Sequence, residues 1–466
     1  MDMISRHMGS ARGIRGRIGG MDPQWDLYGA RVLGAAYVAL CELQGTTIVV
    51  GHDLRTQGRE LAAAFVRGAA SRGADIVDLG LTSLDQTSYT AGVLEVPGVH
   101  IGLGSVGARS NGLQFLGTVR PDQALRQRII NEAARIDVAS LSGRIMAKGR
   151  KATHGTTSSD DTRADYIAHL RSLVGLRRLR PLTVVLDSGN GVAAHLAPGL
   201  LRLPGLRLVQ VNHPLDEHDN GALEAGRLQQ ARRAVLDNAA DLAVVLDADA
   251  SRCAVLDECG EQVGPGTVAA LLAPVLLAGR RGPVVVDTLM GNDVSEVVLG
   301  LGCTLRVCPV GEHHVSRTMA IHDAVLGLEH DGHWHVRDLY GASSGLLTAL
   351  AAVALVGQQG RTLSSLAEAV GRHCCSGELT LSSPDPSGAL RAVEHGFRHH
   401  VLSCEPGEGL VLRGIVTGRG SWWASLTQDE ECQWVRLAVE ADDPAVMEAV
   451  RDDLCSIVRE HHMVAA

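Results

Sequence analysis

A pattern of strand, turn and helix occurs three times in the sequence and limits the folds open to it. Apolar, β-branched runs at 47–50, 181–187 and 283–287 each lead through a turn of small residues into an amphipathic stretch typical of a helix. Strands that are apolar at nearly every position suit a sheet covered by helices on both faces. The pattern therefore predicts repeated α/β layers.

The last part of the chain predicts a smaller α+β domain. Alternating runs at 409–412 and 434–439 indicate strands, and a stretch from Pro444 indicates a final helix. Segment 142–165 is polar and rich in turn residues, so we expect a loop before a helix that begins near Thr162. A chain of 466 residues is long enough for several domains with cores. We expect four of them, at 1–150, 151–262, 263–375 and 376–466.

Composition argues against several classes of partner. The net charge of −9 argues against nucleic acid or an anionic membrane surface as the main partner. No run reaches the roughly 18 apolar residues of a membrane span, and no apolar signal segment is visible near the N-terminus. The ten cysteines lack the spacing of a zinc site. We therefore expect a cytoplasmic protein with reduced thiols; a protein partner or a homo-oligomer stays open.

An acidic turn at 247–252 joins two apolar strands in the segment LAVVLDADASRCAVLDE. Alternate carboxylates in such a turn can converge on one hard cation, because Mg²⁺ takes oxygen ligands in near-octahedral geometry. Asp247 and Asp249 would supply two of these ligands. Ser251, a weaker ligand, stands where a third carboxylate would complete the set. The turn therefore predicts weak Mg²⁺ binding, or two solvated acidic residues without a metal.

Further segments follow known motifs in one order along the chain. They are Gly13-Ile14-Arg15-Gly16, the run from Val49 to Leu81, Asn111-Gly112, the run from Gly327 to His333, and the stretch 421–441. Together with the acidic turn, they resemble the motifs of the α-D-phosphohexomutase superfamily, the phosphoglucomutases and phosphomannomutases. This resemblance implies three related α/β domains and a smaller C-terminal α+β domain around a central cleft, in agreement with the pattern of strands and helices.

The resemblance also implies a chemistry and a set of ligand contacts. Members of the superfamily move a phosphoryl group between two hydroxyls of one sugar, through a phosphorylated serine, a bisphosphate intermediate and Mg²⁺. A sugar phosphate or a related polyol is therefore the expected ligand. The side chains at motif positions that would bind it are Arg15, Arg55, Arg252, His313, Glu329 and His333.

The reactive serine of the superfamily has no direct counterpart here. Counting seven residues back from Asn111 reaches Gly104, which has no side chain to phosphorylate. Ser105 is adjacent, and a loop shortened by one residue would bring it into place; otherwise it is an ordinary turn serine. Gln114 stands where the superfamily has a lysine for proton transfer, and an amide cannot act as a general acid or base.

The sugar-recognition segment keeps two superfamily residues and gains titratable groups. Glu329 can accept hydrogen bonds from two sugar hydroxyls, and His333 is retained, whereas Asp331 replaces a serine and His313 replaces a lysine. Glu329, Asp331 and His333 are the catalytic candidates if this loop forms a metal or acid–base site. The alternative is a set of solvated loop histidines. The other imidazoles of this region belong to His314, His330 and His335.

The phosphate-binding loop of the superfamily falls on residues 427–433, and its usual residues are missing. Arginine, serine, glycine and threonine are replaced, and three of the new residues are acidic. A loop of this kind would repel a dianionic phosphate. The nearest cationic side chains are Arg419 and Arg436.

Departures at four motifs favour a phosphohexomutase-like protein that has lost phosphoserine chemistry, a pseudoenzyme. On this hypothesis it binds a sugar-phosphate-like ligand, as a regulatory or partner subunit or with repurposed chemistry, and Mg²⁺ binding is weak or lost. The alternative is a divergent phosphoglucomutase or phosphomannomutase, an intramolecular phosphotransferase that uses Ser105 and Mg²⁺. A resemblance in fold alone does not decide between them.

Overall fold

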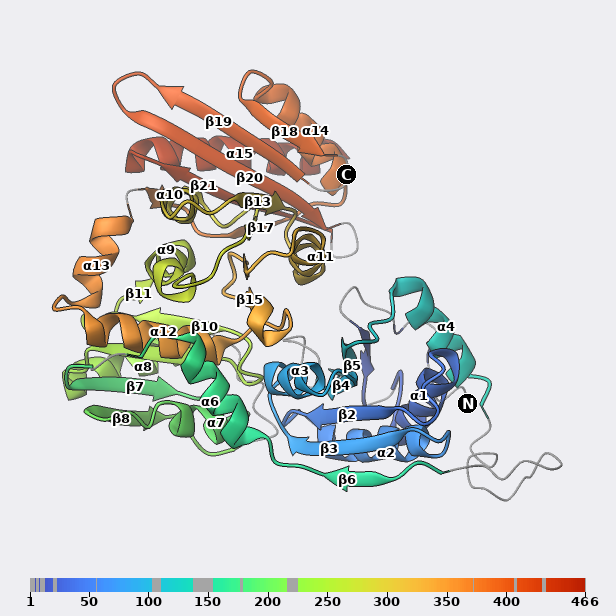
Figure 1. The fold of residues 1–466 in the computed structure, drawn as a ribbon. Helices are drawn as coiled ribbons and strands as arrows, with labels where there is room; N and C mark the ends of the chain where they lie inside the picture. Colours follow the sequence, from blue (N-terminus) through green and yellow to red (C-terminus); the bar gives the residue numbers. More distant parts are fainter. Residues whose placement is uncertain are drawn as a thin grey trace. The chain divides into compact units, whose positions relative to one another are not determined.

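Figure 1 shows the fold in a computed structural model of the protein. The chain divides into two compact units. Unit 1 contains Met1–Gln262 and Val336–Gly360, and unit 2 contains Val263–His335 and Arg361–Ala466. The structure describes residues 5, 8, 13–19, 23–55, 57–102, 110–136, 154–176, 179–215, 225–371, 373–405, 409–429 and 433–465.

Six strands form the first sheet of unit 1: β1 (Ile14–Arg17), β2 (Thr47–His52), β3 (Asp75–Leu81), β4 (Pro97–Ile101), β5 (Ser110–Gly117) and β6 (Thr157–Ser159). They lie in the order β1-β5-β4-β2-β3-β6. The four neighbours β4, β2, β3 and β6 run parallel to one another. β5 runs antiparallel to β4, and β1 runs antiparallel to β5. The helices of this layer are α1 (Leu27–Leu40), α2 (Gly58–Ala70), α3 (Leu84–Val93) and α4 (Gln123–Ala133).

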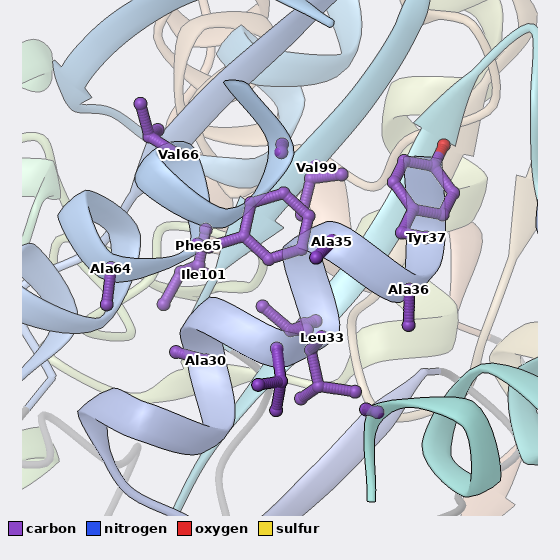
Figure 2. Close-up of a cluster of buried hydrophobic side chains, with 14 of the residues drawn as sticks. Ala30, Leu33, Ala35, Ala36, Tyr37, Ala64, Phe65, Val66, Val99 and Ile101 are labelled. Carbon is purple, nitrogen blue, oxygen red and sulfur yellow. The ribbon is translucent and has the colours of Figure 1, made fainter. Parts of the chain in front are cut away.

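Alternate residues of these strands face opposite sides of the sheet. Ile48 and Val50 of β2 belong to the core shared with α1 and α2, where Figure 2 shows Phe65 among the packed side chains. Gly51, the next residue, faces α3, because an added Cβ there would lie 2.4 Å from Thr87 Oγ1. Helices therefore cover both faces of the sheet, as the apolar strands predicted.

Glycines let α1 and α2 approach closely. An added Cβ at Gly68 would lie 1.8 Å from the carbonyl oxygen of Arg31. We therefore expect Gly68→Ala to lower the free energy of unfolding by about 2 kcal/mol, because the two helices must move apart. Urea denaturation followed by circular dichroism measures this loss.

A matched control is available in α8 (Ala225–Asn238), another helix of unit 1. Gly226 lies in its first turn, and an added Cβ there would meet no atom within 4 Å. Gly226→Ala should leave the stability unchanged or raise it slightly, because alanine is the better helix former. A similar loss in both variants would contradict the explanation by close helix packing.

The second sheet of unit 1 is built from β7 (Leu182–Asp187), β8 (Leu206–Val211), β9 (Leu242–Leu246), β10 (Cys253–Leu256) and β11 (Gln262–Val263). Their order is β11-β10-β9-β7-β8. β8, β7 and β9 run parallel, and β10 returns antiparallel to β9 as a hairpin. The helices of this layer are α6 (Arg163–Leu173), α7 (Ala193–Leu200), α8 and α12 (Gly345–Gln358).

Unit 2 contains a third α/β layer. Its sheet has the order β13-β12-β14-β15, and β12 is parallel to both β13 and β14. The strands are β12 (Val284–Asp287), β13 (Leu305–Cys308), β14 (Leu326–Leu328) and β15 (Trp334–Val336). The helices of this part of unit 2 are α9 (Pro265–Leu276), α10 (Asn292–Gly300), α11 (Glu312–His322) and α13 (Leu363–Val370). A short 3₁₀ turn, η1 (Arg337–Leu339), follows β15 and belongs to unit 1.

The C-terminal part of unit 2 is an antiparallel sheet with two helices. Its main order is β16-β21-β20-β19-β18, and β17 also pairs with β21. The elements are β16 (Cys374–Cys375), β17 (Leu379–Ser382), α14 (Pro386–Gly396), β18 (Val401–Glu405), β19 (Gly409–Val416), β20 (Gly420–Asp429), β21 (Trp434–Ala441) and α15 (Pro444–Ala465).

The predicted fold class is confirmed: three α/β layers precede a C-terminal α+β sheet. One prediction of a loop is wrong, since residues 157–159 form β6, which pairs with the edge of β3. The four domain boundaries stay a prediction. In the described part of the chain, every helix is too short or too polar to cross a membrane.

Candidate functional site

The acidic turn predicted to bind a cation lies in unit 1, at the tip of the β9–β10 hairpin. Asp247 is almost fully buried and accepts three hydrogen bonds. Oδ1 accepts one from the backbone N–H of Arg252 (3.0 Å), and Oδ2 accepts one from Arg252 Nε (2.9 Å) and one from Ser251 Oγ (3.1 Å). Asp249 Oδ1 accepts a hydrogen bond from the backbone N–H of Ser251 (3.1 Å).

The first turn of α12 supports this hairpin. The backbone N–H of Gly345 donates to the carbonyl oxygen of Ala250 (2.9 Å). A Cβ at Gly345 would lie 2.4 Å from the carbonyl oxygen of Arg252, so only glycine permits this approach. Ser344 caps the helix by accepting a hydrogen bond from the N–H of Leu347 (3.1 Å). The geometry of the acidic turn is therefore held by packing and by backbone contacts.

A second buried carboxylate lies at the carboxyl end of β2. Asp53 accepts a hydrogen bond from the backbone N–H of Arg55 (2.9 Å) and pairs with Arg55 Nε at 3.4 Å. Burial raises the pKa of Asp53 to about 7; Arg55 opposes this rise and the negative charge of Asp249 adds to it. The charge of Asp249, in the acidic turn, therefore acts on Asp53 across the two α/β layers of unit 1.

The end of β4 adds a neutral imidazole to this region. His100 is fully buried, and its Nδ1 lies 3.0 Å from Thr87 Oγ1. Burial, together with the neighbouring His52, lowers the pKa of His100 to about 3, so the ring is uncharged at pH 7. Gln114, at the position of the expected lysine, lies opposite His100 in the β4–β5 pair.

The predicted nucleophile lies outside the described residues. Gly104 and Ser105 belong to 103–109, between β4 and β5. Asn111, which ends this motif, is buried in β5. Arg15 is in β1, opposite Gly112 of β5. The role of Ser105 stays a prediction.

The sugar-recognition segment lies in unit 2, in the turn between β14 and β15. The backbone N–H of Glu329 donates to the carbonyl oxygen of His333 (2.9 Å), which closes the turn. The carboxylate of Glu329 is buried, and its Oε1 lies 2.8 Å from His335 Nε2. His333 Nδ1 lies 2.9 Å from both carboxylate oxygens of Asp331. The three catalytic candidates are therefore together in one turn, in two carboxylate–imidazole pairs.

A third such pair fixes the start of the turn. His330 Nδ1 lies 2.7 Å from Asp287 Oδ2, and His330 Nε2 lies 2.9 Å from Glu378 Oε2. Burial would lower the pKa of His330, but the hydrogen bonds from its ring to Asp287 and Glu378, with the charges of Asp287 and Asp331, raise it to about 10. His330 is therefore an imidazolium at neutral pH, held between two carboxylates.

The prediction of solvated loop histidines is wrong for this turn. The side chains of His330, His333 and His335 are 9%, 8% and 0% exposed. Nor do these groups gather around one point: within the ranges that the structure describes, no group of three His, Cys, Asp or Glu side chains could hold a metal ion. His313 lies in the first turn of α11, with its ring centroid 3.8 Å from that of His314.

The segment that aligns with the phosphate-binding loop of the superfamily begins in a strand. Thr427, Gln428 and Asp429 end β20 and pair with β21, and residues 430–432 lie outside the described ranges. Arg436, opposite Thr427, forms an ion pair with Glu378 at 3.6 Å. Arg419 is exposed in the turn before β20. Arg436, one of the two nearest cationic side chains, therefore already has a carboxylate partner.

Comparison with known families and relatives decides the family. Three family models described as phosphoglucomutase/phosphomannomutase alpha/beta/alpha domains I, II and III match residues 7–136, 164–260 and 265–373. A phosphoglucosamine mutase of Streptomyces avermitilis is 30% identical, over 70% of this chain and 72% of the relative. The chain belongs to the phosphoglucomutase/phosphomannomutase family.

Other family members match over nearly their full length. A phosphoglucosamine mutase of Nocardia farcinica is 29% identical, over 96% of this chain and 98% of the relative. A phosphomannomutase of Salmonella montevideo is 25% identical, over 96% of this chain and 97% of the relative. Membership in the α-D-phosphohexomutase superfamily, predicted from the motifs, is therefore confirmed.

Solved structures agree on the fold. A phosphoglucomutase/phosphomannomutase family protein of Burkholderia thailandensis has a TM-score of 0.82 at 21% identity, covering 98% of both chains. The N-acetylphosphoglucosamine mutase of Aspergillus fumigatus, solved with GlcNAc-6P and magnesium, has a TM-score of 0.56 at 14% identity, covering 90% of this chain and 78% of that one.

The acidic turn does not fit Mg²⁺ in the arrangement described above. The guanidinium of Arg252 bonds to Asp247 Oδ2, so a cation at this oxygen would meet a like charge. Two carboxylates are also few for a site whose hard cation prefers oxygen ligands in octahedral geometry. The weak or lost Mg²⁺ binding expected from the sequence stays a prediction.

The Ser251 position offers a direct test of this misfit. We expect Ser251→Asp to gain Mg²⁺ binding, because a third carboxylate can compete with Arg252 for the cation. With 10 mM MgCl₂, the variant should gain about 1 kcal/mol of stability relative to the metal-free sample, by the mass action of bound ligand. Differential scanning fluorimetry measures the gain. Ser251→Asn is the uncharged control, and an equal response in both variants would argue against a cation site at this turn.

The sequence did not reveal the partners of the turn histidines. Glu329 and His335 are six residues apart, and their pairing depends on a tight turn at Gly332, whose φ is +92°. The Asp331-Gly332 dipeptide was a signal for that turn. Asp287 and Glu378 gave no such signal, because they lie far from His330 in sequence.

Proposed function

We propose that the protein binds a hexose phosphate or a hexosamine phosphate and has a phosphohexomutase-type function. One observation carries this proposal: the chain matches a phosphoglucosamine mutase over 96% of its own length and 98% of the relative. Glu329 is the candidate sugar contact, since a carboxylate at this family position can accept hydrogen bonds from sugar hydroxyls. His333, in the same turn, is a second candidate contact.

The comparisons favour an active enzyme over an inactive one. The relatives include phosphoglucosamine mutases and a phosphomannomutase, and they cover almost the whole chain. On this proposal the protein is a divergent intramolecular phosphotransferase in which Ser105 carries the phosphoryl group. Arg15, Arg55 and Arg252 are the candidate phosphate contacts, because a guanidinium can donate two parallel hydrogen bonds to phosphate oxygens.

The contacts of Asp247 support a second candidate, a ligand-binding protein without phosphoserine chemistry. Transfer of a phosphoryl group needs positive charge to neutralise the transferred oxygens. Here a guanidinium and a hydroxyl already bond to Asp247, and Gln114 replaces the proton-transferring lysine. Such a protein would act as a regulatory or partner subunit, or carry repurposed chemistry at Glu329, Asp331 and His333.

An activity assay separates the two candidates. The purified protein is incubated with Mg²⁺, a hexose 1,6-bisphosphate primer and the 1-phosphate of glucose, mannose or glucosamine, and the 6-phosphate product is measured. Conversion that disappears in Ser105→Ala and persists in Ser110→Ala supports the mutase. Binding of the same sugar phosphates by calorimetry without conversion supports the second candidate. Absence of both binding and conversion would contradict both.

A further inference from the structure

A buried carboxylate joins the two α/β layers of unit 1. Asp85, in the first turn of α3, is 1% exposed. Its oxygens accept hydrogen bonds from the hydroxyls of Ser83 and Tyr166 and from the backbone N–H of Gln86 (3.0 Å). The hydroxyl of Ser344 donates a fourth. Tyr166 lies in α6 and Ser344 directly precedes α12, so a side chain of the first layer is bonded to two helices of the second.

These four donors are hydroxyl and amide groups, and none is a basic side chain. A buried carboxylate is costly unless hydrogen bonds replace its lost water. Tyr166 and Ser344 are buried as well, so water cannot take their place at Asp85. A buried polar network with all its partners in place is rigid and specifies one arrangement. The positions of α3, α6 and the start of α12 are therefore fixed relative to one another.

α3 is in turn fixed to the first sheet. Thr87, two residues after Asp85, has its Oγ1 3.0 Å from His100 Nδ1 in β4. The same oxygen lies 2.9 Å from Thr82 Oγ1, just beyond β3. Both contacts are buried. The position of Asp85 therefore follows that of the first sheet.

Ser344 is covalently adjacent to the residue that supports the acidic turn. The hydroxyl of Ser344 also accepts a hydrogen bond from the N–H of Leu347 and so holds the first turn of α12. The next residue, Gly345, donates to the carbonyl oxygen of Ala250 in the acidic turn. A displacement of Ser344 would therefore move the support of this turn.

We propose that Asp85 is a positioning residue that couples the first α/β layer to the acidic turn at 247–252, through Ser344 and the start of α12. Loss of its carboxylate should loosen the acidic turn as well as α3. The coupling itself is independent of the proposed function. Its consequence for catalysis rests on that function, because the turn carries Arg252, a candidate phosphate contact.

Hydrogen exchange followed by mass spectrometry of the full chain tests the coupling. The backbone N–H groups of Gly345, Ser251 and Arg252 all donate to the acidic turn. In Asp85→Ala, peptides that contain them should exchange about tenfold faster than in the wild type. Peptides of β7, a central strand of the second sheet, should keep their rates. Faster exchange in α3 alone, or an equal rise in β7, overturns the proposal.

Two variants show whether the effect belongs to the network. Asp85→Asn keeps an acceptor oxygen, and its amide can donate to hydroxyls that have turned round, so exchange at the acidic turn should return toward the wild-type rate. Tyr166→Phe removes one donor and should give the pattern of Asp85→Ala with a smaller amplitude. This variant keeps the test available if Asp85→Ala does not fold.

Thr90→Val is the matched control. Thr90 Oγ1 lies 3.0 Å from Thr162 Oγ1, so it forms another contact between α3 and the segment before α6, without Ser344. The variant keeps the shape of the side chain and should leave exchange at the acidic turn unchanged. An effect on the turn as large as that of Tyr166→Phe would overturn the assignment to Asp85.

The assay of the proposed function separates the two possible failures. If exchange responds as expected and the wild type neither binds nor converts sugar phosphates, the proposed function fails and the coupling stands. If the wild type binds or converts them and exchange at the acidic turn is unchanged in Asp85→Ala and Tyr166→Phe, the inference alone fails.

Discussion

Asp247→Ala is expected to lower the free energy of unfolding by about 3 kcal/mol or more. The substitution removes the acceptor of three hydrogen bonds and leaves the Arg252 guanidinium, whose side chain is 17% exposed, without its carboxylate. Breaking a buried ion pair from one side costs about 3–5 kcal/mol, because the remaining charge is uncompensated. Urea denaturation at pH 7 measures the change, and circular dichroism of the folded variant verifies its secondary structure.

Asp249→Ala is the matched control for this prediction. Asp249 belongs to the same turn but is more exposed, and its carboxylate accepts a hydrogen bond from the backbone of Ser251. Its removal should cost about 1 kcal/mol. If Asp247→Ala were no more destabilising than Asp249→Ala, Asp247 would not be the structural anchor of this hairpin. A cation site would then explain both carboxylates better.

Raising the pH from 6.5 to 10 is expected to remove about 2–4 kcal/mol of stability through His330 alone. The pKa of His330 is raised from 6.5 to about 10 in the folded protein, chiefly because its hydrogen bonds to Asp287 and Glu378 overcome burial. A group whose folded pKa is raised binds its proton more tightly when folded, so its contribution is complete below the unfolded pKa. That contribution is lost as the pH rises through the folded value, at 1.36 kcal/mol per unit.

The difference in the free energy of unfolding between the wild type and His330→Gln separates this effect from those of the other titrating groups. His330→Gln keeps hydrogen-bonding groups toward Asp287 and Glu378 but carries no titratable proton. The free energy of unfolding of the wild type should exceed that of His330→Gln at pH 6.5, and the difference should shrink by pH 10. A difference that stays constant over this range would show that His330 is neutral in the folded protein.

Much of the fold follows from local sequence patterns. β2, β7 and β12 are apolar, β-branched runs bounded by small-residue turns, so both their type and their position are readable from the chain. β6 is polar and exposed, and it forms a strand because it pairs with the edge of β3. No local sequence pattern predicts this pairing. β20 was not predicted for another reason: its last residues, 427–429, were aligned with a loop of the superfamily.

The site was less predictable than the fold. Motif spacing placed Glu329, Asp331 and His333 in one turn and Asp247 with Asp249 in another, and the structure agrees. The state of these groups depends on partners distant in sequence: Asp287 and Glu378 lie 43 and 48 residues from His330. Sequence periodicity carries no information on such pairs, and they decide which imidazoles are charged.

The discontinuous make-up of unit 1 has a consequence for biosynthesis. α12, which packs on β9 and β10 and supports the acidic turn through Gly345, reaches the ribosomal exit only after residues 263–335. During synthesis, the faces of β9 and β10 that α12 covers therefore stay exposed until residues 263–335 have been added. Expression fragments that stop near residue 262 should aggregate or recruit chaperones, whereas fragments that retain α12 through a short artificial linker should remain dispersed.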